Sequence, residues 1–197
     1  DAFKLANKPF RYNLSVGLAD NTSEITKFDN PSKILSDYYV GQKLGDIWGY
    51  VVDGLFRTDE EAANYNVDQT AVNFVINTAQ VNPGLHAGDM KFVDLDGDHT
   101  ISSGSNTADD PGDRKIIGNS LPRYTYSIQG GFDWYGFDFS IYLQGVGHQD
   151  WYPGTNSVFF WGPYARPYSS FIPRDFLSQV WSPENPDAYF PRPIGYL

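Results

Sequence analysis

The sequence predicts an all-β fold with long connecting loops and a few short helices. Three segments alternate apolar and polar residues with a period of two, which is typical of strands that present each face to a different environment. Aromatic residues make up 17% of the chain, and 19 glycines and 13 prolines supply turns. These features together favour antiparallel strands joined by loops.

The first alternating segment covers residues 9–19 and predicts one long strand. Its large apolar side chains occupy every second position and therefore share one face. They are Phe10, Tyr12, Leu14, Val16 and Leu18. We expect residues 23–28 to continue this strand.

The alternating segments 124–132 and 137–146 predict an antiparallel hairpin, because only the tight turn Asp133–Gly136 separates them. Ten residues at about 3.3 Å each, tilted near 45°, span about 24 Å, which matches the apolar band of an outer-membrane β-barrel. A soluble β-sandwich also alternates in this way. The pattern alone leaves both architectures open.

Residues 20–123 form a connection that is far too long for a hairpin, so we expect a folded insertion or functional loop there. Within it, residues 46–56 predict a strand that ends at an Asp-Gly turn, and residues 89–93 predict another strand.

Short helices are predicted at three places. Thr58 and Glu61 have the spacing of a capping box, which predicts a helix that runs to about residue 65. A second helix is expected over residues 70–80. After an aromatic loop over residues 147–172, a third is expected over 173–181, with the proline at position 173 in its first turn.

Composition excludes several classes of protein. There are 14 basic and 24 acidic residues, and a net charge of −10 argues against a general nucleic-acid binder. The chain has no cysteine, which excludes a disulfide scaffold, a thiolate zinc site and cysteine catalysis. No run of about 18 apolar residues predicts a transmembrane helix.

The acidic loop is the sharpest chemical motif. Asp94, Asp96 and Asp98 occupy positions 1, 3 and 5 of a tight loop, the carbonyl of Thr100 stands at position 7, and an isoleucine follows. This spacing is typical of an EF-hand-like half-site for Ca²⁺, which prefers hard oxygen ligands. We expect a later carboxylate to complete the site, with Asp113 the chosen candidate and Asp109 and Asp110 the alternatives.

Two substitutions weaken the calcium motif. His99 stands at position 6, where glycine is usual because the backbone needs a positive φ, and Ser105 stands where a bidentate glutamate is usual. Residues 89–113 nevertheless hold seven aspartates against one lysine. Such crowding is unfavourable unless a cation or Arg114 compensates it. An ion-free turn is the alternative interpretation.

Eight aromatic residues crowd into the segment between residues 151 and 171. They are Trp151, Tyr152, Phe159, Phe160, Trp161, Tyr164, Tyr168 and Phe171. Aromatic rings stack on sugars and anchor protein interfaces, but they also pack on each other to hold a loop rigid. We take Trp151, Tyr152, Trp161 and Tyr164 as candidates for ligand or partner contact, and the packing role stays open.

The sequence does not predict an enzyme. It contains no glycine-rich phosphate loop and no nucleophile elbow, and nothing selects a pair of catalytic carboxylates. The three histidines, His86, His99 and His148, are scattered over loops, and we expect them to be surface residues rather than ligands.

Five ordered segments resemble SusC/RagA-type TonB-linked outer-membrane transporters. Residues 40–56 contain VGQKLGDIWGY and then DGLF, similar to the family's VGxPLGxxYGYxxDGIF, and residues 88–98 (GDMKFVDLDGD) resemble GDIKYxDxNGDGxI. Residues 113–122 begin DRKIIGN and resemble DRxxIGNxxP. The hairpin 124–146, which ends in LQG, and the WSPENP stretch of 181–186 resemble two further family segments. Within these segments the chain departs from the family pattern at His99 and Trp48, and the residues 109–112 interrupt the approach to DRKIIGN.

The resemblance implies that residues 1–197 are a partial domain from the later part of a transmembrane β-barrel of about 22 strands. The plug domain and the TonB-contacting segment would lie outside this chain. The turn near residue 135 would be periplasmic, residues 20–123 and 147–197 would be extracellular, and the strands would contact membrane lipid of a Gram-negative outer membrane.

The resemblance also implies a function. Such transporters import glycans or oligopeptides with energy supplied through TonB, and a SusD-like surface lipoprotein closes over the barrel as a lid. From the residues alone, a soluble secreted carbohydrate-binding β-sandwich with a calcium loop remains the alternative. That alternative requires the apolar faces around Leu14 and Ile141 to be sealed against a second sheet.

Overall fold

The computed structural model describes residues 2–5, 8–72, 84–154, 157–165 and 171–193. The chain divides into two compact units, each made of several segments. The first unit comprises residues 1–26, 41–47 and 118–151, and the second comprises residues 27–40, 48–117 and 152–197.

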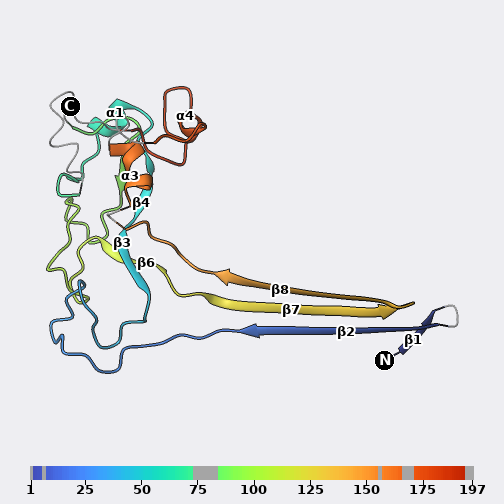
Figure 1. Cartoon of the computed structure of the whole chain (residues 1–197). Helices are drawn as coiled ribbons and strands as arrows, with labels where there is room; N and C mark the ends of the chain where they lie inside the picture. The colour runs from blue at the N-terminus through green and yellow to red at the C-terminus, as the bar shows by residue number, and fades with distance from the viewer. Residues whose placement is uncertain (1, 6–7, 73–83, 155–156, 166–170, 194–197) are drawn as a thin grey trace. The chain divides into compact units, whose positions relative to one another are not determined.

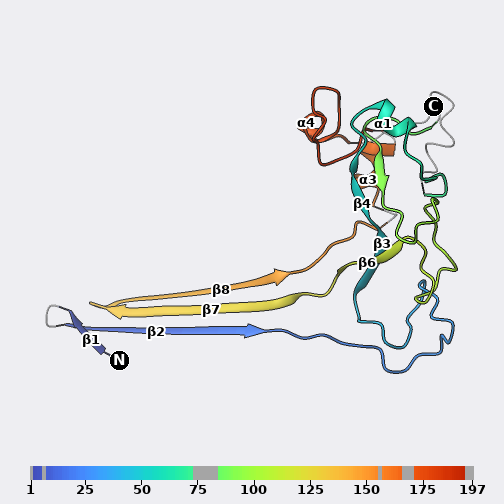
Figure 2. The same ribbon diagram turned by 180° about the vertical axis from the view of Figure 1, so that it is seen from behind.

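The first unit is built on a four-stranded antiparallel sheet with the order β1-β2-β7-β8. Its strands are β1 (Ala2–Leu5), β2 (Lys8–Ala19), β7 (Arg123–Trp134) and β8 (Phe137–His148). In both views of the molecule β2, β7 and β8 are long and lie side by side (Figures 1 and 2). The three strands predicted from alternation are confirmed, and each is one to three residues longer than predicted.

The β7–β8 hairpin closes through a two-residue turn. Tyr135 has a φ of 55° and Gly136 a φ of 86°, so both central residues are left-handed, as a type I′ turn requires. Trp134 pairs with Phe137 on either side of this turn. The predicted tight turn is therefore present, and it is shorter than the four residues assigned to it.

One expectation for the first unit fails, and one strand was not predicted. Residues 23–28 do not extend β2; they make only an isolated bridge, in which the Ile25 N–H donates to the Gln42 carbonyl at 2.9 Å and the Leu44 N–H donates to the Ser23 carbonyl at 2.8 Å. The short strand β1 escaped prediction because four residues are too few to reveal a period of two.

Four further strands form two small sheets. β3 (Asp46–Tyr50) pairs with β6 (Arg114–Asn119), and β4 (Val52–Leu55) pairs with β5 (Met90–Phe92). The strand expected over 89–93 is confirmed as β5. The single strand expected over 46–56 is wrong, because Val51 separates β3 from β4, and the Asp-Gly pair lies inside β4, where the register shifts.

The helix α1 (Asp59–Ala63) begins at the predicted capping box. The Thr58 hydroxyl accepts the Glu61 N–H at 3.1 Å. Glu61 reaches back one residue further than a standard box, and its carboxylate accepts the Arg57 N–H at 2.9 Å. Together the two contacts satisfy donors at the start of the helix, which explains why so short a helix forms here.

The remaining helices differ from expectation. α3 (Val158–Ala165) lies in the segment 147–172 that was expected to be a loop. α4 (Phe176–Gln179) is shorter than the helix expected over 173–181, and residue 173 precedes it. Of the helix expected over 70–80, residues 73–80 lie outside the described part of the chain.

The second unit has an ordinary buried core. Phe56 and Ile101 are fully buried, and Ala62, Phe92, Phe176 and Val180 are nearly so. The Phe56 ring meets the Tyr65 ring edge-on at 5.2 Å between centroids. Within the described residues, none of the helices has the length and apolar character that crossing a membrane requires.

Candidate functional site

The sheet of the first unit has one apolar and one polar face. Directly paired residues share a face, and the pairings align Leu14 with Gly130 and Ile141, and Val16 with Ile128 and Leu143. The apolar side chains on this face are largely exposed: Tyr12, Leu14, Val16, Leu18, Phe137, Phe139, Ile141 and Leu143. Leu14 is 69% and Leu18 is 74% exposed, which gives no support to a sandwich, whose inner face would be buried.

The apolar face is graded along the strands. Aliphatic residues occupy its middle, and aromatic residues occupy both ends. Towards the hairpin turn, the Phe132 ring stacks with Phe10 at 5.7 Å and with Phe139 at 5.4 Å between centroids. At the other end, Gly145 lies under the Tyr126 ring, so that any Cβ at this position would collide with it.

The opposite face is polar and carries uncharged side chains over most of its length. The pairings place on it Asn13, Ser15, Ser127, Gln129, Ser140, Tyr142 and Gln144. Charged residues on this face occur at its two ends. At the hairpin end Arg11 pairs with Asp133 and Asp133 with Asp138, and at the other end Arg123 pairs with His148.

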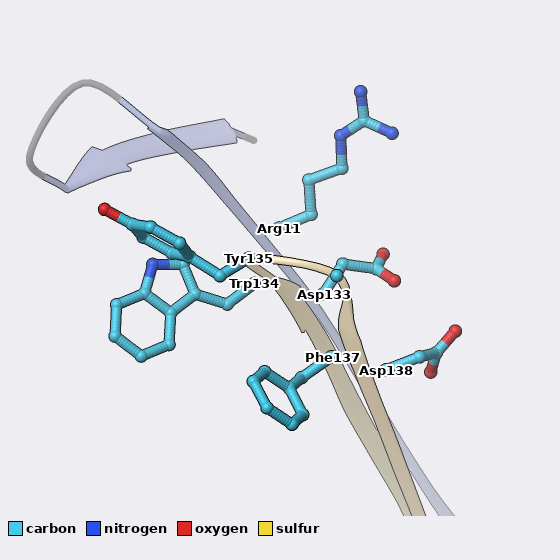
Figure 3. Close-up of a pocket in the computed structure, with 7 residues that line it drawn as sticks. Arg11, Asp133, Trp134, Tyr135, Phe137 and Asp138 are labelled. Atoms are coloured by element: carbon cyan, nitrogen blue, oxygen red, sulfur yellow. The ribbon is translucent and has the colours of Figure 1, made fainter.

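The hairpin end of the sheet carries aromatic side chains on one face and charged side chains on the other. A shallow hollow there is lined by Arg11, Asp133, Trp134, Tyr135, Gly136, Phe137 and Asp138. Figure 3 shows the rings of Trp134, Tyr135 and Phe137 on one side of the ribbon and the charged groups on the other. The Trp134 and Tyr135 rings meet edge-on at 4.8 Å between centroids.

The acidic loop of the second unit is folded around Asp94. The Asp94 carboxylate accepts the N–H of Gly97 at 2.6 Å and the N–H of His99 at 2.9 Å. His99 has a φ of 66°, so the position where glycine is usual keeps the left-handed backbone without glycine. The histidine therefore does not prevent the loop conformation that the motif requires.

Three carboxylates converge in this loop. Asp94, Asp96 and Asp113 each place one oxygen within 4.8 Å of the others. Asp113 is fully buried, and its two oxygens accept the N–H of Leu95 and the N–H of Ser102, each at 2.7 Å. These two bonds hold Asp113 beside the loop although it lies well beyond it in the sequence.

The other candidate carboxylates are not part of this cluster. The Asp98 carboxylate accepts the Thr100 N–H at 2.7 Å and is not one of the three that converge. Asp109 forms an ion pair with Lys33 at 2.8 Å, and Asp110 accepts the hydroxyl and the N–H of Ser105.

Charge in the cluster is only partly compensated within the chain. Asp96 accepts the Asp98 N–H, which lowers its pKa, but partial burial and the neighbouring carboxylates of Asp98, Asp113 and Asp94 outweigh this and raise its pKa above the usual value. Burial raises the pKa of Asp94, but the His99 and Gly97 N–H groups outweigh it and leave that pKa lowered.

Arg114 does not neutralise the cluster, contrary to one expectation. Its guanidinium donates to the carbonyls of Pro111 and Ser103 and to the Asn106 side chain, and in the described part of the chain it makes no ion pair. Excess negative charge therefore remains where a cation would be favoured.

A neighbouring segment holds the acidic loop in place, and the sequence analysis missed it. The Asp68 N–H donates to the His99 carbonyl at 2.8 Å, and the Ile101 N–H donates to the Asp68 carbonyl at 2.7 Å. Gln69 is almost fully buried; its amide donates to the Met90 carbonyl at 2.8 Å and accepts the Phe92 N–H at 3.0 Å. These contacts join residues that lie 21 to 33 positions apart in the sequence, so no local sequence pattern could predict them.

The histidines are not all surface residues as expected. His99 and His148 are exposed, but only 19% of the His86 side chain is exposed. Its Nδ1 lies 3.4 Å from a carboxylate oxygen of Asp59.

The aromatic candidates differ in exposure and in their contacts. Trp151 is 72% and Tyr152 is 53% exposed. Trp161 is 37% exposed, and its indole N–H donates to the carbonyls of Pro153 and Gly154. The side chain of Tyr164 lies outside the described part of the chain, so packing and ligand contact both stay open as roles for this group.

The chain is similar to a known protein over most of its length. No protein-family model matches the chain. In an alignment of 160 positions that covers 70% of this chain, the chain is 28% identical to a TonB-dependent receptor of Formosa agariphila. The chain spans 15% of the length of that relative.

Proposed function

We propose that this chain forms part of the wall and outer loops of an outer-membrane active transporter that imports large nutrients. The single observation that carries the proposal is the sheet that exposes a continuous apolar face and carries a polar face behind it. A strand pair of this kind suits a wall between hydrocarbon and a wet interior. The similarity to a TonB-dependent receptor supports the same function.

The connections between strands support a defined orientation. Two residues separate β1 from β2, and two separate β7 from β8. The strand pairing puts the end of β1 and the end of β7 at the same end of the sheet. The connection from β2 to β7 leaves from the opposite end and includes about half of the chain. Outer-membrane barrels have short periplasmic and long extracellular connections, so the turn at Tyr135 and Gly136 would be periplasmic.

The experiment uses the full polypeptide in a Gram-negative host. We expect it to fractionate with the outer membrane, and we expect nutrient uptake that is abolished when TonB is deleted or the inner-membrane potential is collapsed. Recovery of the folded protein from the soluble fraction, without detergent, would overturn the proposal and favour the soluble carbohydrate-binding alternative.

The partner and cargo follow as finer parts of the proposal. A SusD-like lipoprotein would close over the extracellular loops, and a glycan or oligopeptide would be held between lid and loops. The exposed rings of Trp151 and Tyr152 suit either a sugar face or a protein anchor. Replacing Trp151 with alanine should weaken either lipoprotein co-purification or cargo binding, with the exposed, non-aromatic change Gln149→Ala as control.

We also propose that Asp94, Asp96 and Asp113 hold Ca²⁺ and thereby fix the acidic loop. Converging carboxylate oxygens, a buried Asp113 and uncompensated charge support this assignment. Adding Ca²⁺ to the chelator-treated protein should release heat in titration calorimetry and raise the melting temperature. Absence of both signals would remove calcium from the proposal.

A pair of variants tests which carboxylates bind the ion. Asp96→Asn removes one charged ligand from the cluster and should weaken Ca²⁺ binding by about 10-fold or more. Without calcium the same variant should be no less stable, because it relieves repulsion among the three carboxylates. Asp53→Asn neutralises an exposed carboxylate outside the cluster and should leave calcium binding unchanged.

A further inference from the structure

The chain leaves the sheet of the first unit after β8, just before the exposed Trp151. We propose that Asp150 is a positioning residue, which ties this exit point to Asn119 and so fixes the backbone from which the Trp151 ring projects. This role rests on the proposed function, because that function assigns a contact to the Trp151 ring, and it adds what holds the ring in place. All three residues belong to the first unit.

Asp150 and Asn119 exchange two hydrogen bonds. The Asp150 N–H donates to the Asn119 carbonyl at 3.0 Å, and the Asn119 N–H donates to the Asp150 carboxylate at 2.8 Å. The two residues lie 31 positions apart, so these bonds join the segment after β8 to the last residue of β6. Because one bond uses the backbone of Asp150 and the other its side chain, together they restrict the direction of the chain at this point.

Gly118 leaves the space that the Asp150 side chain occupies. A Cβ at position 118 would lie 2.7 Å from Asp150 Oδ2 and 2.9 Å from Asp150 Cβ, closer than real Cβ atoms approach other atoms. Gly118 does not have a positive φ, so close approach rather than backbone conformation requires glycine here. Gly118→Ala would therefore displace the Asp150 carboxylate without removing it.

The anchor for Asp150 is itself held by its side chain. The Asn119 amide nitrogen donates to the Leu44 carbonyl and to the Asp46 carboxylate, each at 3.0 Å. The Asn119 side-chain oxygen accepts the Leu121 N–H at 2.9 Å. Both polar atoms of this side chain are thus engaged, and Asp150 is tied to a residue that is fixed from a second direction.

His148 contributes a further contact to the Asp150 carboxylate. Its Nε2 lies 3.0 Å from Asp150 Oδ2, the same oxygen that accepts the Asn119 N–H. The Asn119 N–H is the largest cause that lowers the pKa of Asp150, and His148 lowers it further against the opposing effect of burial. The carboxylate is therefore charged at neutral pH, which strengthens the bond that it accepts from Asn119.

The two neighbouring side chains differ in exposure. The Asp150 side chain is 34% exposed and is engaged with the sheet end, whereas Trp151 is 72% exposed. A side chain that must be ordered on binding loses conformational entropy, and preorganisation reduces that loss. A fixed backbone immediately before Trp151 would lower the entropy lost when its ring makes a contact, so the bonds of Asp150 serve binding as well as the fold.

Fluorine NMR of the full receptor labelled with fluorotryptophan tests this role without any ligand. Trp151→Phe and Trp134→Phe identify the two resonances that matter. We expect Asp150→Ala to move the Trp151 resonance towards its position in the unfolded protein and to leave that of Trp134, at the hairpin end of the same sheet, unchanged. Gly118→Ala should produce the same shift, because it displaces the carboxylate.

Two further variants separate positioning from a general effect on stability. Asp150→Asn keeps an acceptor for the Asn119 N–H and should move the Trp151 resonance less than Asp150→Ala does. The matched control Asp138→Ala removes an exposed carboxylate near the hairpin and should leave Trp151 unchanged.

An unchanged Trp151 resonance in Asp150→Ala and Gly118→Ala would overturn the positioning role. Equal shifts at Trp151 and Trp134 would also overturn it, because they would indicate a general loss of the sheet. Either result in a protein whose import still depends on TonB would leave the proposed function standing. Absence of TonB-dependent uptake by the unmodified protein would remove the proposed function and is measured separately from these resonances.

Discussion

The two compact units of this chain treat the same kinds of side chain in opposite ways. In the sheet of the first unit, Leu14, Val16 and Leu18 are 67 to 74% exposed. In the second unit, Phe56 and Ile101 are completely buried. Apolar area is costly in water, so an apolar surrounding would stabilise the exposed face of the first unit, whereas the second unit builds its own core.

The largest expected effect tests the core of the second unit. Phe56→Ala would remove a fully buried ring that packs on Tyr65, and we expect a loss of about 3–5 kcal/mol in the stability of this unit. Resistance to proteolysis as a function of urea would measure it. The matched control is Phe171→Ala, which removes an 86% exposed ring and should change stability by less than about 0.5 kcal/mol. Equal losses of stability from Phe56→Ala and Phe171→Ala would contradict the contrast between a buried ring and an exposed one.

The next effect tests the apolar face. Leu14→Arg places a charge in the middle of the apolar face, which the proposed function sets against hydrocarbon, and should cost about 2–4 kcal/mol of folding free energy in lipid. Ser15→Arg, on the polar face of the same strand, should cost much less. Folding into lipid vesicles at increasing urea concentrations measures both. A larger loss from Ser15→Arg would mean that the two faces have been assigned the wrong way round.

Prediction from sequence succeeded where one strong local signal was present. Alternation over residues 9–19, 124–132 and 137–146 gave β2, β7 and β8, because a strand between two unlike environments must alternate. The Thr58 box gave α1. β6 was missed because its sequence, RKIIGN, has no alternation and becomes a strand only through pairing with β3.

In the acidic loop, too, the sequence predicted what a local pattern encodes and missed what depends on distant contacts. Its spacing identified Asp94 and Asp96, and the missing ligand at the end of the loop directed attention to Asp113. The spacing also included Asp98, whose carboxylate instead accepts the Thr100 N–H. The role of Gln69 could not be predicted from the sequence. Its side chain hydrogen-bonds the backbone of a strand that is distant in the sequence, and such a contact produces no periodic pattern of residues.

A smaller effect tests the buried side-chain amide of Gln69. Gln69→Leu keeps a side chain of similar size but removes the partners of the Phe92 N–H and the Met90 carbonyl, so we expect a loss of about 1–3 kcal/mol. Hydrogen exchange at the Phe92 amide should accelerate accordingly. Gln149→Leu removes an exposed amide contact to Ser120 and should be close to neutral. Unchanged exchange at Phe92 in the first variant would show that Gln69 does not protect this strand.

The smallest effect tests the backbone of the acidic loop. At His99, with a φ of 66°, glycine should be more stable than alanine by about 0.5–1 kcal/mol, because the left-handed penalty of alanine outweighs the entropy that glycine loses on folding. Both variants lose the contact between His99 Nδ1 and the Asn66 carbonyl, so their difference isolates the backbone term. At Ser103, which does not have a positive φ, the order should reverse. Calcium-free thermal unfolding of the four variants measures both differences. If alanine equalled or exceeded glycine at position 99, the loop would not hold the left-handed turn on which the convergence of Asp94 and Asp96 depends.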